Sequence, residues 1–221
     1  GLPPEDFPPL PEYSEKPLLE FDGKILKEMI RKTFFSVSPD ETRQALNGLL
    51  LESEGDSANL VGTDGHRLAM ISRPVKSNVS KGESLSFLLP KKALSELLKL
   101  MEDEDETFGF SSQDNHLAFI CGKQVIVSRK IDGKFPNYRQ VIPADNNLNA
   151  KANRDDLTHA LKRVALLADE KSKMVRFEIR KGNLTLASDN TDLGAAVEEM
   201  ALEYEGEEVS IGLNAKYVLD I

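Results

Sequence analysis

The sequence predicts an α+β protein in which antiparallel sheets are covered on one side by amphipathic helices. A short strand, a capping residue and an amphipathic helix follow one another four times, starting at Leu19, Ser86, Asn149 and Ser210. Short alternating segments joined by hairpin-type turns fill the sequence between these starts. The starts lie roughly 60 to 70 residues apart, which is longer than most solenoid periods, so duplicated sheet-plus-helix modules are expected.

Each expected helix carries apolar residues on one side and lysine or arginine on the other. Complete helices are predicted at residues 23–35, 90–101 and 154–168, and a further helix begins after Asn214. Good capping or first-turn residues mark the N-terminal ends, namely Asp22, Pro90, Asn153 and Asn214. The basic residues opposite the apolar stripes are Lys24, Lys27, Arg31, Lys92, Lys99, Lys162 and Arg163.

Strands are predicted where apolar and polar residues alternate between turn-forming pairs. Asp64-Gly65, inside the second predicted strand, indicates a bend or a hairpin turn. Residues 193–204 mix small, apolar and acidic side chains, and a strand is favoured there over a helix. The predicted strands are residues 45–53, 58–72, 107–111, 116–121, 123–131, 174–180, 183–188 and 193–204.

The composition is that of an ordinary globular chain, with 40% hydrophobic and 29% charged residues. No apolar run approaches the ~20 residues needed to cross a bilayer, and no signal-peptide pattern is present. Cys121 lies in an apolar run and is expected to be a small core residue in a reducing compartment, which favours the cytoplasm. The formal net charge is −9, so contact with nucleic acid would require basic residues to be gathered on one surface.

The sequence contains no recognisable motif for catalysis or for metal binding. The three histidines lie far apart, and there is no phosphate-binding loop, no Gly-x-Gly-x-x-Gly and no Gly-x-Ser-x-Gly string. Asp64 and His66 lie in one short turn and are candidates for an acid–base pair. The plainer interpretation is that Asp64-Gly65 makes the turn and His66 packs beside it, so no catalytic residue, metal or cofactor is expected.

The basic helix faces are the main sign of a partner. Taken one at a time, each is typical of a solvated surface. The same pattern on three helices favours contacts with phosphates, which need no base recognition and weaken with salt. Aromatic residues do not alternate with these charges, so the expected partner is a duplex backbone rather than stacked single-stranded bases. Leu166 and Leu167 interrupt the polar side of the third helix and indicate either an ordinary exposed pair or a protein contact.

Three strings then occur in order along the chain: VGTDGHRLA at residues 61–69, DGKFPNY at 132–138 and GLNAKYVLD at 212–220. Together they resemble the bacterial replicative sliding clamps, the β subunits of DNA polymerase III. The similarity covers essentially the whole chain. Each string alone is weak, but three in register are specific.

The resemblance implies a division of the chain into the end of domain 1 or a linker (1–16), a central domain 2 (17–145) and a truncated domain 3 (146–221). Gly1 in place of methionine and a helix that has barely begun at Ile221 agree with a fragment. Such a fragment is expected to be unable to close a ring.

The resemblance also implies the DNA clamp fold, with antiparallel sheets outside and paired helices on the inner face. Clamps of this family are head-to-tail homodimeric rings through which duplex DNA passes without sequence specificity. The implied function is a non-catalytic processivity factor of the DNA polymerase III holoenzyme, rather than a nucleotidyltransferase. The implied partners are duplex DNA, the polymerase catalytic subunit, the clamp loader and other proteins with a clamp-binding motif.

Carried over by position, a hydrophobic pocket for a short apolar-ended peptide is implied at Leu46, Thr63, Gly65, His66, Arg67, Leu68, Pro136 and Val141. Gln140 stands where some members have arginine, and the segment that completes the pocket in the family is absent. DNA contacts are implied at Arg43, Lys91 and Lys92, with Lys27, Arg31, Lys162 and Arg163 as further candidates. The contact with the other subunit is implied at Leu166 and Leu167.

Two other functions stay open at this level. One is a peptide-binding adaptor without DNA contact, which predicts that the basic helix residues do not share one surface. The other is a hydrolase or nuclease that uses Asp64 and His66, which predicts dependence on a divalent metal.

Overall fold

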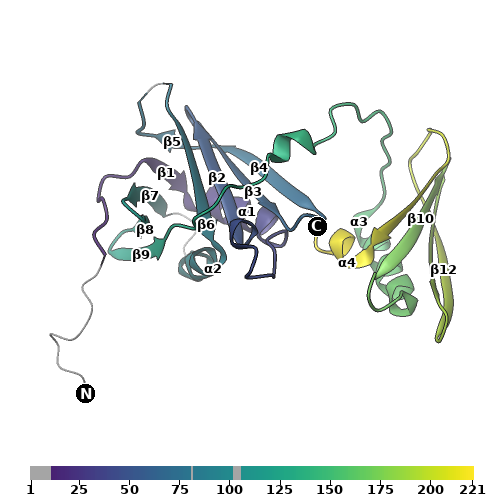
Figure 1. Ribbon diagram of the computed structural model, residues 1–221. Helices are drawn as coiled ribbons and strands as arrows, with labels where there is room; N and C mark the ends of the chain where they lie inside the picture. The colour runs from purple at the N-terminus through teal and green to yellow at the C-terminus, as the bar shows by residue number, and fades with distance from the viewer. Residues whose placement is uncertain (1–10, 81, 102–105) are drawn as a thin grey trace, which may run out of the picture. The chain divides into compact units, whose positions relative to one another are not determined.

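The computed structural model describes residues 11–80, 82–101 and 106–221, and it shows an α+β chain with antiparallel sheets (Figure 1). In three of the four predicted units a strand leads directly into a helix. Helix α1 (Gly23–Phe34), helix α2 (Lys91–Leu100) and helix α4 (Ala215–Leu219) each begin at the residue after a strand ends.

By its contacts the chain divides into two compact units, Gly1–Arg139 and Gln140–Ile221. The sequence placed this boundary after Asp145, and residues 140–150 are exposed throughout. The separate first segment expected at residues 1–16 falls largely outside the described residues.

Two antiparallel sheets form the first unit. The sheet β4-β3-β2-β6 contains β2 (Gly48–Glu54), β3 (Ser57–Thr63), β4 (Leu68–Pro74) and β6 (Ser84–Pro90). The sheet β5-β1-β7-β8-β9 contains β1 (Leu19–Asp22), β5 (Lys76–Ser77), β7 (Thr107–Gln113), β8 (His116–Cys121) and β9 (Gln124–Arg129).

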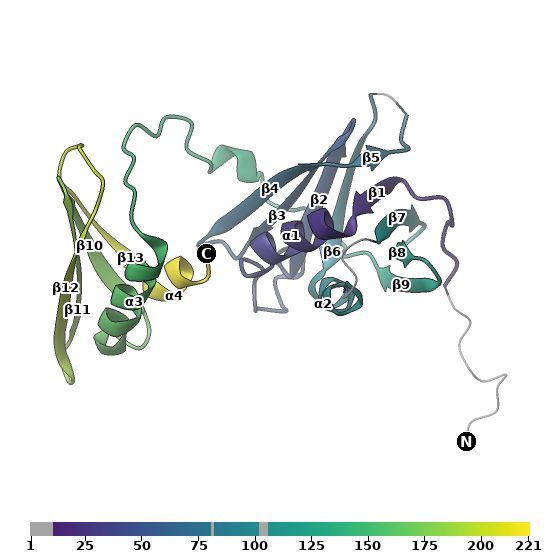
Figure 2. The same ribbon diagram turned by 180° about the vertical axis from the view of Figure 1, so that it is seen from behind.

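Helices α1 and α2 contact each other and pack against the strands, with α1 lying across β3 and β4 (Figure 2). Helix α1 begins where the sequence predicted, because the Asp22 carboxylate accepts hydrogen bonds from the backbone N–H groups of Lys24 and Ile25 at 2.9 and 3.2 Å. Its buried residues Leu26, Met29 and Ile30 join one large apolar core with the inward side chains of the strands.

The opposite face of sheet β4-β3-β2-β6 is also covered. Side chains alternate along a strand, so Leu49 and Leu51 face the helices while Leu50 faces away. On that far face a smaller core forms where Phe135 and Tyr138 pack over Leu50 and its neighbours. We call the chain segment that carries these two rings, residues 130–139, the strap.

The second unit is a single sheet with helices on one face. The sheet β12-β11-β10-β13 contains β10 (Met174–Arg180), β11 (Asn183–Asn190), β12 (Gly194–Ala201) and β13 (Val209–Asn214). Helix α3 (Arg154–Val164) and α4 supply Leu161, Val164 and Ala215 to its core. Asn153 caps α3 by accepting the N–H groups of Asp155 and Asp156 at 2.9 and 3.1 Å.

Most predicted elements are confirmed, including the strand favoured within residues 193–204, and three need correction. The third helix ends at Val164 and tightens into the 3-10 turn η4 (Ala165–Leu167) instead of running on to residue 168. The first predicted strand opens with the 3-10 turn η2 (Gln44–Leu46). The short strand expected at residues 149–153 does not form, because only Lys151 pairs there, in an isolated bridge with Glu203, and Asn153 then caps α3. The bend or hairpin turn expected at Asp64-Gly65 is confirmed as the turn between β3 and β4.

Candidate functional site

The turn between β3 and β4 is built by its own side chains. Thr63 donates from Oγ1 to the Arg67 carbonyl at 2.6 Å and accepts the Gly65 N–H at 3.1 Å. Gly65 has a φ of +93°, a conformation that favours glycine. Asp64 Oδ1 accepts the N–H groups of His66 and Arg67 at 2.9 and 3.0 Å, while Oδ2 accepts from Arg67 Nε at 3.0 Å.

Through these hydrogen bonds Asp64 stabilises the turn. Burial opposes its ionisation, but the N–H groups of His66 and Arg67 and the Arg67 guanidinium together hold the pKa of Asp64 below its ordinary value. The carboxylate is therefore a charged anchor of the turn. The plainer interpretation of Asp64, as a turn former, is the one that these hydrogen bonds support.

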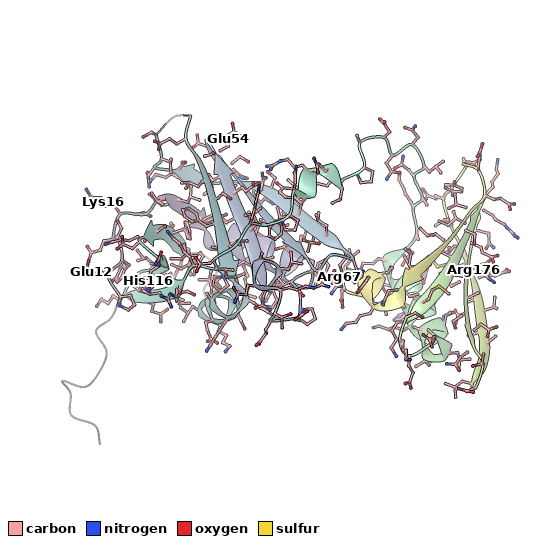
Figure 3. The ribbon with its side chains drawn as sticks, in the orientation of Figure 1. Glu12, Lys16, Glu54, Arg67, His116 and Arg176 are labelled. Atoms are coloured by element: carbon pink, nitrogen blue, oxygen red, sulfur yellow. The ribbon has the colours of Figure 1, made fainter. Side chains whose placement is uncertain are left out.

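Arg67 joins the turn to the end of α1. Its Nη2 donates to the Phe35 carbonyl at 2.6 Å, and its guanidinium lies 5.4 Å from the centre of the Phe35 ring. Figure 3 shows Arg67 at the end of the sheet opposite to Glu54. Arg43, a predicted DNA residue, reaches the same turn, because its Nη1 donates to the Asp64 carbonyl at 3.4 Å.

The apolar part of the predicted pocket lies beside this turn. Leu46, in η2, and Leu68, at the start of β4, are half-buried and pack against the core of Phe135 and Tyr138. Pro136 follows Phe135 in the strap and is exposed. The structure thus places Leu46 and Leu68 against one small core, and Pro136 next in sequence to Phe135 of that core.

Val141 belongs to the second unit and is 69% exposed. Its membership of the pocket stays a prediction, as does that of every other residue assigned from the resemblance.

Apart from Arg43, which lies before η2, the predicted DNA residues of the first unit lie on its two helices. Arg31 on α1 and Lys92 on α2 are exposed, while Lys27 and Lys91 are half-buried. Because α1 and α2 contact each other, these charges share one side of the unit.

In the second unit Lys162 is exposed, but the charge of Arg163 is already paired. The Arg163 guanidinium forms an ion pair with Glu198 on β12, with Nη2 2.6 Å from Oε2. Among the predicted DNA residues, Arg163 is therefore the one least suited to bind a phosphate.

The predicted subunit contact lies at the C-terminal end of α3. Leu166 is 76% exposed, and Leu167 beside it in η4 is half-buried. Sequence reasoning predicted a strand at the neighbouring β12 but missed that it is an edge strand of its sheet. A groove of about 790 Å³ runs between α3 and β12 and includes Arg163 and Glu198. The small residues of β12 and its adjacent acids Glu198 and Glu199, with few large apolar side chains, are the signal that would have marked an exposed strand.

Sequence reasoning also missed the network that holds the strap. Tyr138 donates its hydroxyl to Glu52 Oε2 at 2.7 Å, and Arg139 Nη2 donates to the same oxygen at 2.7 Å. Burial and the hydrogen bond to Glu52 raise the pKa of Tyr138 to about 12, so this hydroxyl stays protonated at neutral pH. Two buried rings therefore hold the strap on the sheet, Phe135 before Pro136 and Tyr138 after it.

In the described part of the chain no group of three or more His, Cys, Asp or Glu side chains is placed to hold a metal ion. Among the described helices none is long and apolar enough to cross a membrane.

Comparison with known proteins identifies the family. Residues 20–137 match the family model for the DNA polymerase III beta subunit, central domain, and residues 139–221 match that for its C-terminal domain. The Beta sliding clamp of Chlamydia pneumoniae is 36% identical over 98% of this chain and 58% of its own length. That of Escherichia coli (strain K12) is 33% identical over 100% of this chain and 59% of its own length.

Solved structures give the same answer for the fold. The DNA polymerase sliding clamp of Pseudomonas aeruginosa superposes with a TM-score of 0.89 at 32% identity, over 99% of this chain and 59% of that one. A sliding clamp of Bartonella birtlesii bound to griselimycin superposes with a TM-score of 0.91 at 33% identity, over 99% of this chain and 60% of that one. The chain thus spans about three fifths of the length of these relatives. It has the clamp fold and belongs to the family of the DNA polymerase III beta subunit, the bacterial sliding clamps.

Proposed function

We propose that this chain acts within a processivity factor that encircles duplex DNA and tethers a replicative polymerase. The observation that carries the proposal is the placement of exposed Arg31 and Lys92 on two touching helices of a family member whose net charge is −9. Such a helical layer suits weak, sequence-independent contacts with phosphates. No catalytic step is assigned to the chain, in keeping with its family of non-catalytic subunits.

The β3–β4 turn and the strap form the proposed site for partner proteins. An apolar-ended peptide would rest on Leu46 and Leu68, with the backbone of the turn and Pro136 at its edge. Sliding clamps of Pseudomonas aeruginosa and Bartonella birtlesii have been solved bound to griselimycin, which supports a ligand site in this family. The partners proposed for this chain are the polymerase catalytic subunit, the clamp loader and other proteins with a clamp-binding motif.

The second unit is proposed to meet another subunit. Exposed Leu166 and the open edge of β12 offer an apolar contact and unpaired backbone groups side by side. A strand of the partner subunit would complete the β12 edge and bury the leucine. The assembled protein is then a homodimeric ring that works in the bacterial cytoplasm.

The peptide site is tested by binding of a fluorescent peptide with an apolar C-terminal end, followed by anisotropy. We expect saturable binding that weakens at least tenfold when His66→Ala and Pro136→Ala are combined. The matched control combines His159→Ala and Pro74→Ala, two exposed residues of the same types outside the proposed pocket. Equal affinities of the two double variants would remove the site from this turn.

A peptide-binding adaptor without DNA contact is the second candidate function. The pairing of Arg163 with Glu198 favours it, because a guanidinium already paired with a carboxylate gains less from a phosphate. The two candidates differ in the salt dependence of DNA binding.

A further inference from the structure

A second cavity lies on the strap face of sheet β4-β3-β2-β6, on the β6 side. It measures about 490 Å³, a size within the range of ligand sites. Its floor is apolar, formed by Leu50, Leu88 and the rings of Phe135 and Tyr138. None of the residues assigned by the family resemblance except Pro136 lines it.

The rim of this cavity is cationic. Lys130, Lys134 and Arg139 line it together with a single acid, Glu52. Glu52 is already engaged, because it accepts the Tyr138 hydroxyl and the Arg139 guanidinium. Lys134 is exposed, and no ion pair of Lys134 occurs among the described residues. The charges of Arg139 and Glu52 cancel each other, and Lys130 donates to the Asp114 carbonyl. Lys134 and Lys130 therefore leave the rim with a net positive charge, which in a chain of net charge −9 favours an anion.

The strap separates this cavity from the proposed peptide pocket. Its rings pack over β2, the cavity lies over β2 and β6, and the pocket lies at the ends of β3 and β4. Pro136 lines the cavity and is also assigned to the proposed pocket. Neighbouring strands lie about 4.8 Å apart, so two or three strand spacings, about 10 to 14 Å, separate the two sites. An extended peptide covers that distance in about three to five residues.

We propose that the cationic cavity binds acidic residues that flank the apolar motif of a partner peptide, about three to five residues from the motif. The inference rests on the proposed function, since it assumes that the motif itself occupies the pocket beside Leu46 and Leu68. An acidic peptide is favoured over a free small anion because Pro136, which lines the cavity, is also a residue assigned to the proposed peptide pocket. One bound segment can then cross the strap and use both.

The experiment compares three labelled peptides on this 221-residue chain at low and moderate salt. One carries the apolar motif flanked by serines, and two carry it with four aspartates or glutamates on one side or on the other. We expect one acidic peptide to bind about threefold to tenfold more tightly than the serine peptide at low salt, because exposed ion pairs contribute little each. Added salt should remove most of this gain.

Two charge reversals locate the effect. Lys134→Glu should abolish the gain and leave the serine peptide unaffected, which also shows that the strap is intact. Lys123→Glu, an exposed lysine on the turn between β8 and β9, changes the net charge equally and should keep the gain. A gain that survives Lys134→Glu, or that both reversals reduce alike, overturns the cavity as the site.

The two proposals fail in different ways. If the serine peptide binds and neither acidic peptide binds more tightly, the peptide pocket stands and the cationic site is wrong. If no peptide binds a folded chain, both are wrong. If free tetraglutamate competes with the serine peptide, the acids enter the pocket itself, and the separate site is wrong as well.

Discussion

At the scale of single residues, Asp64 decides whether the β3–β4 turn keeps its shape. We expect Asp64→Asn to lower the free energy of unfolding by about 2–4 kcal/mol, because Arg67 loses its buried partner. Chemical denaturation of the wild type and the variant measures this difference. Asp132→Asn, an exposed strap residue, serves as the control and should change stability by less than about 0.5 kcal/mol.

The same pair predicts a pH dependence. The pKa of Asp64 is lower in the folded chain than in the unfolded chain, so its stabilisation is present above about pH 4 and disappears as pH falls through the folded value. The stability difference between the wild type and Asp64→Asn should therefore shrink below pH 4. A difference that stays constant from pH 7 to pH 3 would show that the charge of Asp64 does not stabilise the turn.

Cys121 gives an independent residue-scale prediction. Burial, together with its hydrogen bond to Glu106, raises the pKa of the Cys121 thiol to about 12. Only the thiolate reacts, so we expect the native chain to react with a disulfide reagent at pH 8 at least a hundredfold more slowly than the unfolded chain. Absorbance of the released thiol measures both rates. Rapid reaction of the native protein would contradict the buried position.

The sequence identified the local chemistry of the site but not its long-range ties. Asp64-Gly65 was readable as a turn because both residues are turn formers. The bond from Arg67 to Phe35 and that from Tyr138 to Glu52 join residues 32 and 86 positions apart. No periodic pattern connects such residues, so only the folded chain shows that the pocket is fastened to α1 and to the sheet.

At the scale of elements, the helix caps allow each unit to be destabilised separately. Asp22→Ala removes the cap of α1, and Asn153→Ala removes the cap of α3. We expect each to cost about 1 kcal/mol in its own unit only, because the two units have separate cores. Hydrogen exchange followed by mass spectrometry reports each unit. Equal loss of protection in both units after either change would mean that they unfold together.

Elements whose apolar residues recur with a clear helical or strand period could be predicted, and very short elements could not. Helix α1 was expected at residues 23–35 and spans Gly23–Phe34, because its apolar stripe and Asp22 cap are both clear in the sequence. The strand β5 has two residues and the turns η2 and η4 have three each, too few to show any period. The pairing of β2 with β6 could not be predicted from the sequence either, because many residues separate the two strands.

At the scale of the whole molecule, the charge distribution decides between a DNA clamp and an adaptor. Arg31 and Lys92 are exposed on touching helices, so both can reach one duplex backbone. If each neutralises one phosphate, the combined variant Arg31→Gln and Lys92→Gln should reduce the slope of log K against log salt by about 1.8. Fluorescence anisotropy with a labelled duplex from 25 to about 150 mM salt measures this slope.

The control for that measurement neutralises two exposed lysines in turns, Lys123→Gln and Lys181→Gln. It changes the net charge by the same amount, so a general electrostatic effect would weaken DNA binding equally in both variants. A slope that changes only with Arg31 and Lys92 assigns the contact to the helical layer. An unchanged slope in both variants would leave the peptide site as the remaining function of this chain and favour the adaptor, because an acidic protein without a local basic surface has no means of holding a duplex.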